Sequence, residues 1–127
     1  MKAVLAAAST IAVVGASPNP ARPSNRVAQY LLRHGFEVIP VRSKVEKILG
    51  RKCYPRLDDI PEPVDIVDVF RRQEACPEVA CAAVAIGARV LWLQEGIISE
   101  EAARIARSGG LEIFMDRCIK KPHQKFL

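Results

Sequence analysis

The chain has 127 residues, half of them apolar and about a quarter charged, which is the balance of one soluble domain with its own core. No apolar run reaches the length of a membrane span, so no membrane partner is expected. The net charge of +5 fits a nucleic acid or a phosphorylated small molecule as partner, and equally no particular partner, because net charge speaks to solubility and association more than to function.

The N-terminal segment has two interpretations. Lys2, an apolar run and then small residues are typical of a secretory signal, whereas "TIAVVGA", Thr10–Ala16, is typical of a buried strand. Ser9 and Thr10 interrupt the apolar run, which is unfavourable for a signal. We therefore predict a first strand over Thr10–Ala16, preceded by a short helix or arm over Ala3–Ala8.

A helix and a second strand are expected next. "SNRVAQYLLRHG" has apolar residues at helical spacing, with Ser24 as the predicted N-cap and Gly35 as the stop signal. Phe36–Val41 reads as a strand. Residues 46–63 contain several Gly and Pro breaks and predict an irregular connection with a helical turn or two.

The second half alternates strands and helices. Val64–Phe70 is a third strand in which Asp65 and Asp68 are expected to be solvated or to cap. We predict a helix over residues 74–87, with Pro77 in its first turn, and a strand over Ala88–Gln94. A helix capped by Ser99 and a fifth strand over Leu111–Asp116 follow, before a basic tail that is expected to lie over the surface.

This alternation predicts an α/β fold. Parallel neighbouring strands need crossover connections, and helices provide them. We therefore expect a Rossmann-like, doubly wound, parallel five-stranded sheet with helices on both faces, forming one domain over residues 1–127.

Ligands of such sheets bind beyond the carboxyl ends of the strands. After the first strand, Gly15, Ala16 and Ser17 are small enough to let a ligand approach the backbone, and the following helix offers N–H groups to an anion. An ordinary strand-to-helix turn is the alternative interpretation of the same residues. The segment also lacks the Gly-x-Gly-x-x-Gly fingerprint of dinucleotide enzymes.

Cations follow the second and third strands. Arg42 and Lys44 stand where NAD enzymes keep an acidic residue, so a phosphorylated ribose, as in NADP or coenzyme A, is favoured over NAD, although a solvated basic loop is an alternative. Phe70, Arg71 and Arg72 follow the third strand and could pack on a ligand and bind phosphate.

Catalytic and metal-binding groups are not evident in the sequence. His34 is expected to cap a helix, Glu95 is the carboxylate expected nearest to the ligand, and Cys118 is expected to be buried or inert. No Cys-x-x-Cys pair occurs, so neither a zinc nor a redox motif is predicted, and we expect free thiols in a cytoplasmic protein. The four cysteines are Cys53, Cys76, Cys81 and Cys118.

Several long motifs carry a family resemblance: "TIAVVGASPNPARPSNRVAQYLLRHGFEVIPV", "ILGRKCYPRLDDIPEPVDIVDVFRR", "GARVLWLQEGI" and "MDRCIK". From about Ala8 to Lys120 the chain resembles the small, stand-alone CoA-binding domain proteins of bacteria and archaea. That family is similar to the N-terminal CoA-binding domain of the succinyl-CoA synthetase alpha subunit and of ADP-forming acyl-CoA synthetases. The resemblance implies a Rossmann-like domain that binds coenzyme A at the strand ends.

The resemblance also implies roles for individual residues. Gly15, Ala16 and Ser17 match the loop on the diphosphate side, and Lys44 matches a basic residue that faces the 3′-phospho-ADP part. "QEGI" resembles the "TEGI" that follows the fourth strand of the synthetase domain. The predicted coenzyme A-binding residues are Gly15, Ala16, Ser17, Arg22, Ser24, Val41, Arg42, Lys44, Val69, Phe70 and Arg71.

This sequence departs from the family pattern in two places. Arg42-Ser43 stands where the family usually has Asn-Pro, and the tail differs from the usual ending. The phosphorylated histidine of the synthetases belongs to a second domain that has no counterpart here, so no ligase activity is expected.

These observations favour a non-catalytic protein that binds coenzyme A or an acyl-CoA, as a carrier, sensor or regulator of acyl-CoA metabolism. A protein partner or a second copy of the chain is compatible with that role. The alternative is an NADP-dependent oxidoreductase that uses the same cleft. Nucleic-acid binding is not predicted, because basic residues are not interleaved with aromatic ones in any recognised motif.

Overall fold

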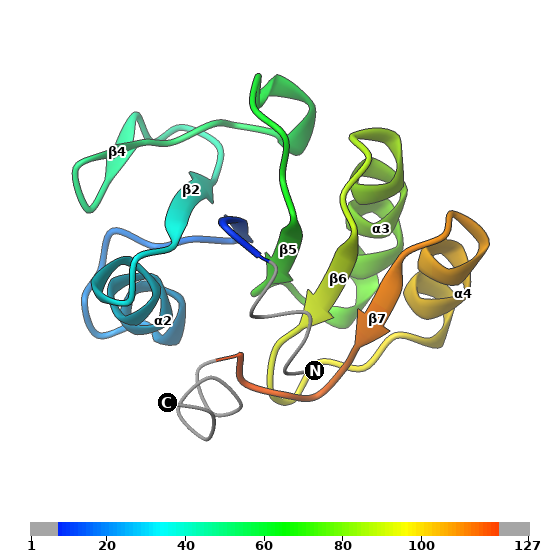
Figure 1. Ribbon diagram of the computed structural model, residues 1–127. Helices are drawn as coiled ribbons and strands as arrows, with labels where there is room; N and C mark the ends of the chain where they lie inside the picture. Colours follow the sequence, from blue (N-terminus) through cyan, green and yellow to red (C-terminus); the bar gives the residue numbers. More distant parts are fainter. Residues whose placement is uncertain (1–7, 120–127) are drawn as a thin grey trace.

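The computed structural model describes residues 8–119, which form a parallel sheet with helices on both faces. The strand order is β2-β1-β5-β6-β7 (Figure 1). The bounds of the five strands are β1 Thr10–Val14, β2 Glu37–Val41, β5 Ile66–Val69, β6 Val90–Leu93 and β7 Glu112–Phe114. Every neighbouring pair is parallel. The predicted doubly wound α/β fold is confirmed.

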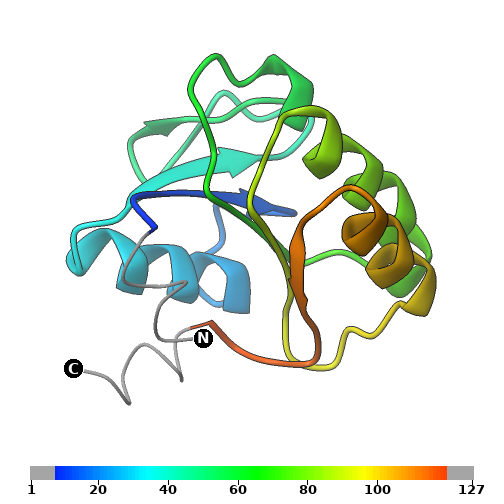
Figure 2. The ribbon, with the colours of Figure 1, turned by 45° about the vertical axis from the view of Figure 1, so that its right-hand side comes forward.

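The helices divide between the two faces. Helix α2, Pro23–Arg33, lies on one face, and α3, Cys76–Ala85, and α4, Glu100–Ser108, lie on the other (Figures 1 and 2). The chain runs from β1 outward to β2 and then crosses to β5 on the far side of β1. The strand order therefore reverses between β1 and β5, and such a switch point is where open α/β sheets bind ligands.

The central strands are apolar because both of their faces are covered. Alternate residues of each strand enter the two hydrophobic clusters: Val67 and Leu91 pack with α3 and α4, while Ile66 and Trp92 pack on the side of α2. All four side chains are fully buried. On the α2 side the chain after β7 completes the cover, since the Trp92 indole Nε1 donates to the Arg117 carbonyl oxygen at 2.7 Å.

The helix ends follow ordinary capping chemistry, with one correction. Ser99 caps α4 as predicted, its Oγ accepting the Ala102 N–H at 3.1 Å. For α2 the predicted N-cap at Ser24 is wrong: the N-cap is Arg22, and Pro23 is the first helical residue. Proline at this position lacks only an N–H that would have no partner inside the helix, and its fixed φ suits the helix start.

The connection from β2 to β5 contains more structure than the sequence pattern indicates. Residues Lys47–Ile48 (β3) and Arg51–Lys52 (β4) form an antiparallel hairpin, and Leu57–Asp59 (η1) form a 3-10 turn. The turn of the hairpin has φ +53° at Leu49 and φ +73° at Gly50. Leucine is uncommon at positive φ, so Leu49 does not indicate a turn, and Gly50 alone did not suffice to predict the hairpin.

Asp68 contradicts the expectation of a solvated or capping side chain. It lies on β5 between Val13 of β1 and Trp92 of β6, and it is fully buried. Its Oδ1 accepts a hydrogen bond from Gln94 Nε2 at 2.5 Å, and its Oδ2 has no partner among the described residues. Burial raises the pKa of Asp68 to about 8, against the lowering effect of the Gln94 hydrogen bond.

Asp65 behaves as the sequence predicts. Its Oδ2 accepts from the Ser9 and Thr10 N–H groups, at 2.8 and 3.0 Å, and thereby caps the entry into β1. The predicted helix or arm over Ala3–Ala8 lies outside the described residues apart from Ala8, and so does most of the basic tail. Among residues 8–119 no helix is long and apolar enough to cross a membrane. All four cysteines are free thiols.

Candidate binding site

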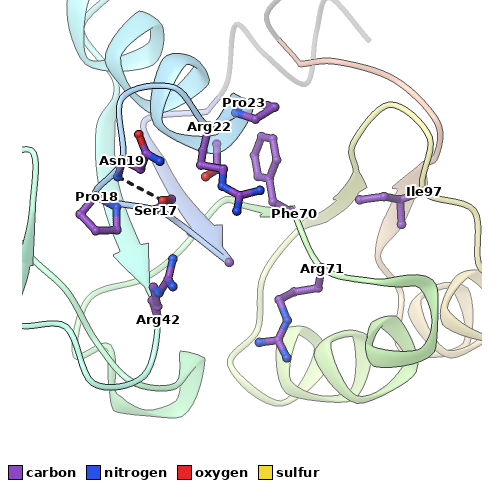
Figure 3. A pocket seen from close by; sticks show the side chains of 11 residues that line it. Ser17, Pro18, Asn19, Arg22, Pro23, Arg42, Phe70, Arg71 and Ile97 are labelled. Carbon is purple, nitrogen blue, oxygen red and sulfur yellow. Dashed lines mark hydrogen bonds between the residues drawn. The ribbon is translucent and has the colours of Figure 1, made fainter.

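A cavity of about 580 Å³ opens at the switch point, beyond the carboxyl ends of β1 and β5 (Figure 3). The loop after β1, the first turn of α2, the ends of β2 and β5, and the loop after β6 all contribute to its wall. The lining residues are Gly15, Ser17, Pro18, Asn19, Arg22, Pro23, Ser24, Arg42, Phe70, Arg71 and Ile97.

Gly15 allows two strand ends to approach each other at the base of this cavity. Its φ is +83°, and a Cβ built there would overlap the Phe70 carbonyl oxygen and lie 3.0 Å from the Arg71 Cδ. Both the conformation and the close contact exclude a side chain. Backbone is therefore exposed to a ligand at the point where β1 ends.

The loop after β1 is held in place by buried polar groups. Asn25, almost completely buried in the first turn of α2, donates its amide to the Ser17 carbonyl oxygen at 2.8 Å. Gln29 donates to the Asn25 Oδ1 at 2.6 Å, one helical turn later. The Ser17 hydroxyl accepts the Asn19 N–H at 3.1 Å (dashed in Figure 3). The loop is thus fixed before any ligand binds.

The cavity is strongly cationic. Arg22, Arg42 and Arg71 reach it from three different elements (Figure 3), and none of the described residues that line it carries a carboxylate. Arg42 Nη1 donates to the Ala16 carbonyl oxygen at 3.2 Å. At the start of α2, Pro23 has no N–H and the Asn25 N–H donates to the Arg22 carbonyl oxygen, so the Ser24 N–H is the donor without an acceptor among the described residues and can attract an anion. This combination of donors binds phosphate groups well.

A second cavity, of about 720 Å³, adjoins the first, and Arg42 and Arg71 line both. It lies between the ends of β1 and β2, the segment around η1 and helix α3. Its wall is mixed: Val41, Leu57 and Val79 are apolar, whereas Asp58 and Glu78 place carboxylates on it. Because they share these two arginines, the two cavities together form a cleft that is cationic at the junction and mixed in character in its second part.

Comparison with known proteins assigns the chain to a family. Residues 9–124 match the family model described as a CoA binding domain. The chain belongs to this CoA-binding domain family. It is 40% identical to the uncharacterized protein YneT of Bacillus subtilis, over 97% of this chain and 91% of YneT.

Solved structures of similar chains share this fold. A hypothetical protein from Pyrococcus horikoshii has a TM-score of 0.95 and 41% identity, covering 98% of this chain and 87% of its own. A Thermus thermophilus protein has a TM-score of 0.94 and 34% identity, over 99% and 96% of the two chains. The chain is also 33% identical to an ADP-forming acetate–CoA ligase of Archaeoglobus fulgidus, but spans only 17% of that enzyme.

Most of the residues predicted from the sequence lie at this cleft of the CoA-binding domain. Gly15, Ser17, Arg22, Ser24, Arg42, Phe70 and Arg71 line the first cavity, and Val41, Arg42 and Arg71 line the second. Ala16 and Val69 are buried and line neither cavity. Lys44 is exposed, has φ +65°, and follows Ser43, which lines the second cavity.

The sequence did not identify several of the lining residues. Pro18, Asn19 and Ile97 line the first cavity, although the loops that contain them were recognised as loops at the strand ends. The η1 segment and α3, which line much of the second cavity, carry no signal because their contribution depends on how they pack. Glu95, expected near the ligand, is exposed in the β6–α4 loop and lines neither cavity.

The remaining candidate groups lie elsewhere. His34 is the C-cap of α2, as predicted, and Cys118 packs against the hydrophobic cluster on the α2 face. Burial raises the pKa of the Cys53 and Cys76 thiols, which opposes thiolate formation at neutral pH. Within residues 8–119 no three His, Cys, Asp or Glu side chains gather into a metal site.

Proposed function

We propose that the protein binds coenzyme A along the two joined cavities and acts by recognition, without catalysing a reaction. The observation that carries the proposal is the first cavity, in which three arginines and a helix N-terminus face a glycine loop with no carboxylate among the described lining residues. Membership of the CoA-binding domain family selects coenzyme A from the phosphorylated ligands that such a cavity could accept.

The diphosphate of the ligand would occupy the first cavity. Gly15 exposes backbone at the end of β1, and Ser24, whose N–H has no acceptor among the described residues, lines the same cavity. Arg42 and Arg71 stand on either side of the opening (Figure 3). Arg guanidinium groups can bind phosphate oxygens through two parallel hydrogen bonds, so each arginine adds orientation as well as charge.

The nucleoside end would occupy the second cavity. Adenine is planar and mostly apolar, and the Val41, Leu57 and Val79 side chains provide an apolar wall of matching character. Ser43 lines the same cavity and is followed by Lys44. We assign Lys44 to the 3′-phosphate, which its ammonium group would bind, as the family resemblance implies.

The pantetheine arm would then extend toward Phe70 and Ile97. Phe70 lies beneath Pro23 in the first cavity, and Ile97 points toward the cavity from the opposite side (Figure 3). These two apolar side chains line the first cavity and not the second, so a ligand that places its adenine in the second would direct its other end to them. The thiol end of coenzyme A leaves the cleft at this side.

A binding role without catalysis is supported in the first cavity by the position of the titratable groups, whereas Asp58, Glu78 and Cys81 line the second cavity, to which we assign the nucleoside. His34 ends α2, whereas the cavity opens at the N-terminal end of that helix. Asp68 is sealed within the core. A carrier, sensor or regulator of acyl-CoA metabolism needs only selective binding, which this cleft can provide.

Calorimetric titration of the wild-type protein with coenzyme A, dephospho-CoA, NADP and NAD tests the proposal. We expect coenzyme A to bind, dephospho-CoA to bind more weakly because it lacks the 3′-phosphate, and NAD to bind weakly or not at all. Tight binding of NADP without affinity for coenzyme A would overturn the proposal in favour of an oxidoreductase.

A charge-matched pair of variants locates the ligand. Arg42→Ala removes a cation shared by both cavities, whereas Arg51→Ala removes an exposed cation from β4, which lines neither cavity. We expect Arg42→Ala to weaken coenzyme A binding about tenfold, as for loss of one charged hydrogen-bonding group, and Arg51→Ala to leave it nearly unchanged. Equal effects would show that only net charge matters, and would refute the assignment of the cleft.

A further inference from the structure

The loop between β6 and α4 is tied to the end of β7 by a pair of reciprocal hydrogen bonds. The Gly96 N–H donates to the Asp116 Oδ1 at 2.6 Å, and the Asp116 N–H donates to the Ile97 carbonyl oxygen at 3.1 Å. The Ile97 N–H in turn donates to the Gln94 carbonyl oxygen at 2.9 Å. Residues 94–97 therefore form a turn that Asp116 holds from outside.

Both ends of this link have a backbone conformation that favours particular residues. Gly96 has φ +87°, and Asp116 has φ +55°, which is one of three positive φ values among the non-glycine residues described. Aspartate is among the few side chains that tolerate this region, because it can hydrogen-bond locally. The carboxylate at residue 116 is thus directed to the loop by a backbone conformation that most residues would not adopt.

The residue positioned by this link is Ile97. It is half-buried, packs with one side against the core cluster formed with α3 and α4, and lines the first cavity opposite the loop after β1. Asp116 itself is exposed and does not line the cavity. Any effect of Asp116 on a ligand must therefore pass through the β6–α4 loop.

We propose that Asp116 is a positioning residue for ligand binding: it holds the β6–α4 loop so that Ile97 forms the wall against the pantetheine arm of coenzyme A. This inference rests on the proposed function. It predicts that Asp116 matters for the thiol half of the ligand and not for the nucleotide half, because Ile97 lines only the first cavity and not the second.

The test compares coenzyme A with adenosine 3′,5′-bisphosphate, which lacks the pantetheine arm. Asp116→Gly removes the carboxylate that accepts the Gly96 N–H and adopts the positive φ without strain, whereas Asp116→Asn keeps a side-chain oxygen acceptor and tolerates the same φ. By calorimetry we expect Asp116→Gly to weaken coenzyme A about fivefold, the loss typical of one hydrogen bond, and to leave the bisphosphate nearly unchanged. Asp116→Asn should bind both ligands almost as the wild type does.

A double-mutant cycle tests whether Asp116 acts through Ile97. Ile97→Ala removes the wall directly. Adding Asp116→Gly to this variant should therefore cause almost no additional loss of coenzyme A binding. Full additivity would overturn the inference, as would an equal loss for both ligands, no loss for coenzyme A, or an Asp116→Asn protein that behaves like Asp116→Gly. Wild-type protein that fails to bind coenzyme A would refute the proposed function and this inference together, whereas wild-type binding with equal losses refutes the inference alone.

Discussion

Replacing Asp68 by asparagine should change how the stability of the protein depends on pH. The Asp68 side chain is fully buried, and burial raises its pKa from 3.8 to about 8, with the Gln94 hydrogen bond acting in the opposite direction. At neutral pH the folded protein therefore holds a proton on Asp68 that the unfolded chain releases. Asparagine has nearly the shape of this protonated acid and can accept the same hydrogen bond from Gln94 Nε2.

The sign of the effect follows from proton linkage. Between the two pKa values the folded state binds more protons than the unfolded state, so the free energy of unfolding falls as pH rises. The contribution is complete below the unfolded-state pKa and is lost as pH rises toward 8. At 1.36 kcal/mol per pKa unit, the wild type loses about 4 kcal/mol relative to Asp68→Asn between pH 5 and pH 8.

Urea unfolding of both proteins at several pH values from 5 to 8 measures this difference. We expect similar stabilities at pH 5, a growing advantage for Asp68→Asn above it, and equal m-values throughout. Asp65→Asn is the control. Burial raises the pKa of Asp65, but the hydrogen bonds that it accepts from Ser9 and Thr10 lower the pKa by more, so the net pKa is below its usual value. That group stays ionised from pH 5 to pH 8, so its variant should run parallel to the wild type. If the free energy of unfolding of Asp68→Asn also ran parallel to that of the wild type from pH 5 to pH 8, the reasoning would be refuted.

Three further variants test the site and the fold. Lys44→Ala should weaken coenzyme A more than dephospho-CoA in calorimetry, whereas Lys47→Ala on the exposed face of β3 should affect neither; equal losses for the two ligands would remove Lys44 from the 3′-phosphate. Gly15→Ala should lose about 3 kcal/mol of unfolding free energy in urea and abolish binding, because its Cβ would overlap the Phe70 carbonyl. Gly35→Ala, at φ +87° in open space, should lose only about 1 kcal/mol, and similar losses for both would contradict the close contact. Ser99→Ala should cost about 1 kcal/mol through loss of the α4 cap, and a change below a few tenths would show that the cap is not needed.

The fold could be predicted because its signals are local and repeat along the chain. Each buried strand is a short apolar run, and each helix begins or ends with a recognisable residue, such as Ser99 or Gly87. The position of the site followed from topology, because parallel strands bring all their carboxyl ends to one edge. That rule selected the loops that carry Arg42 and Arg71, although it also selected Lys44 and Arg72, which line neither cavity.

What could not be predicted depends on packing between distant segments. The sequence pattern indicates a solvated or capping role for Asp68, yet β5 lies in the middle of the sheet, where both faces are covered. Only the tertiary structure shows that Gln94, 26 residues later, supplies a partner for Asp68. The hydrogen bond between Gly96 and Asp116 likewise could not be predicted, because no sequence pattern indicates that these two residues are in contact.

The cleft combines a fixed backbone with exposed cations, and the two parts contribute differently to recognition. Asn25 and the Ser17 hydroxyl hold the loop after β1, so the loop loses little freedom when a ligand binds. Within residues 8–119 the Arg22 and Arg71 guanidinium groups make no hydrogen bond or ion pair, so ordering each side chain costs up to about 2 kcal/mol of conformational entropy. Much of the attraction that these arginines supply is therefore offset, and salt screens the remainder. Selectivity must then come mainly from the backbone loop and the shape of the two cavities, while the arginines raise affinity for any polyanionic ligand that fits.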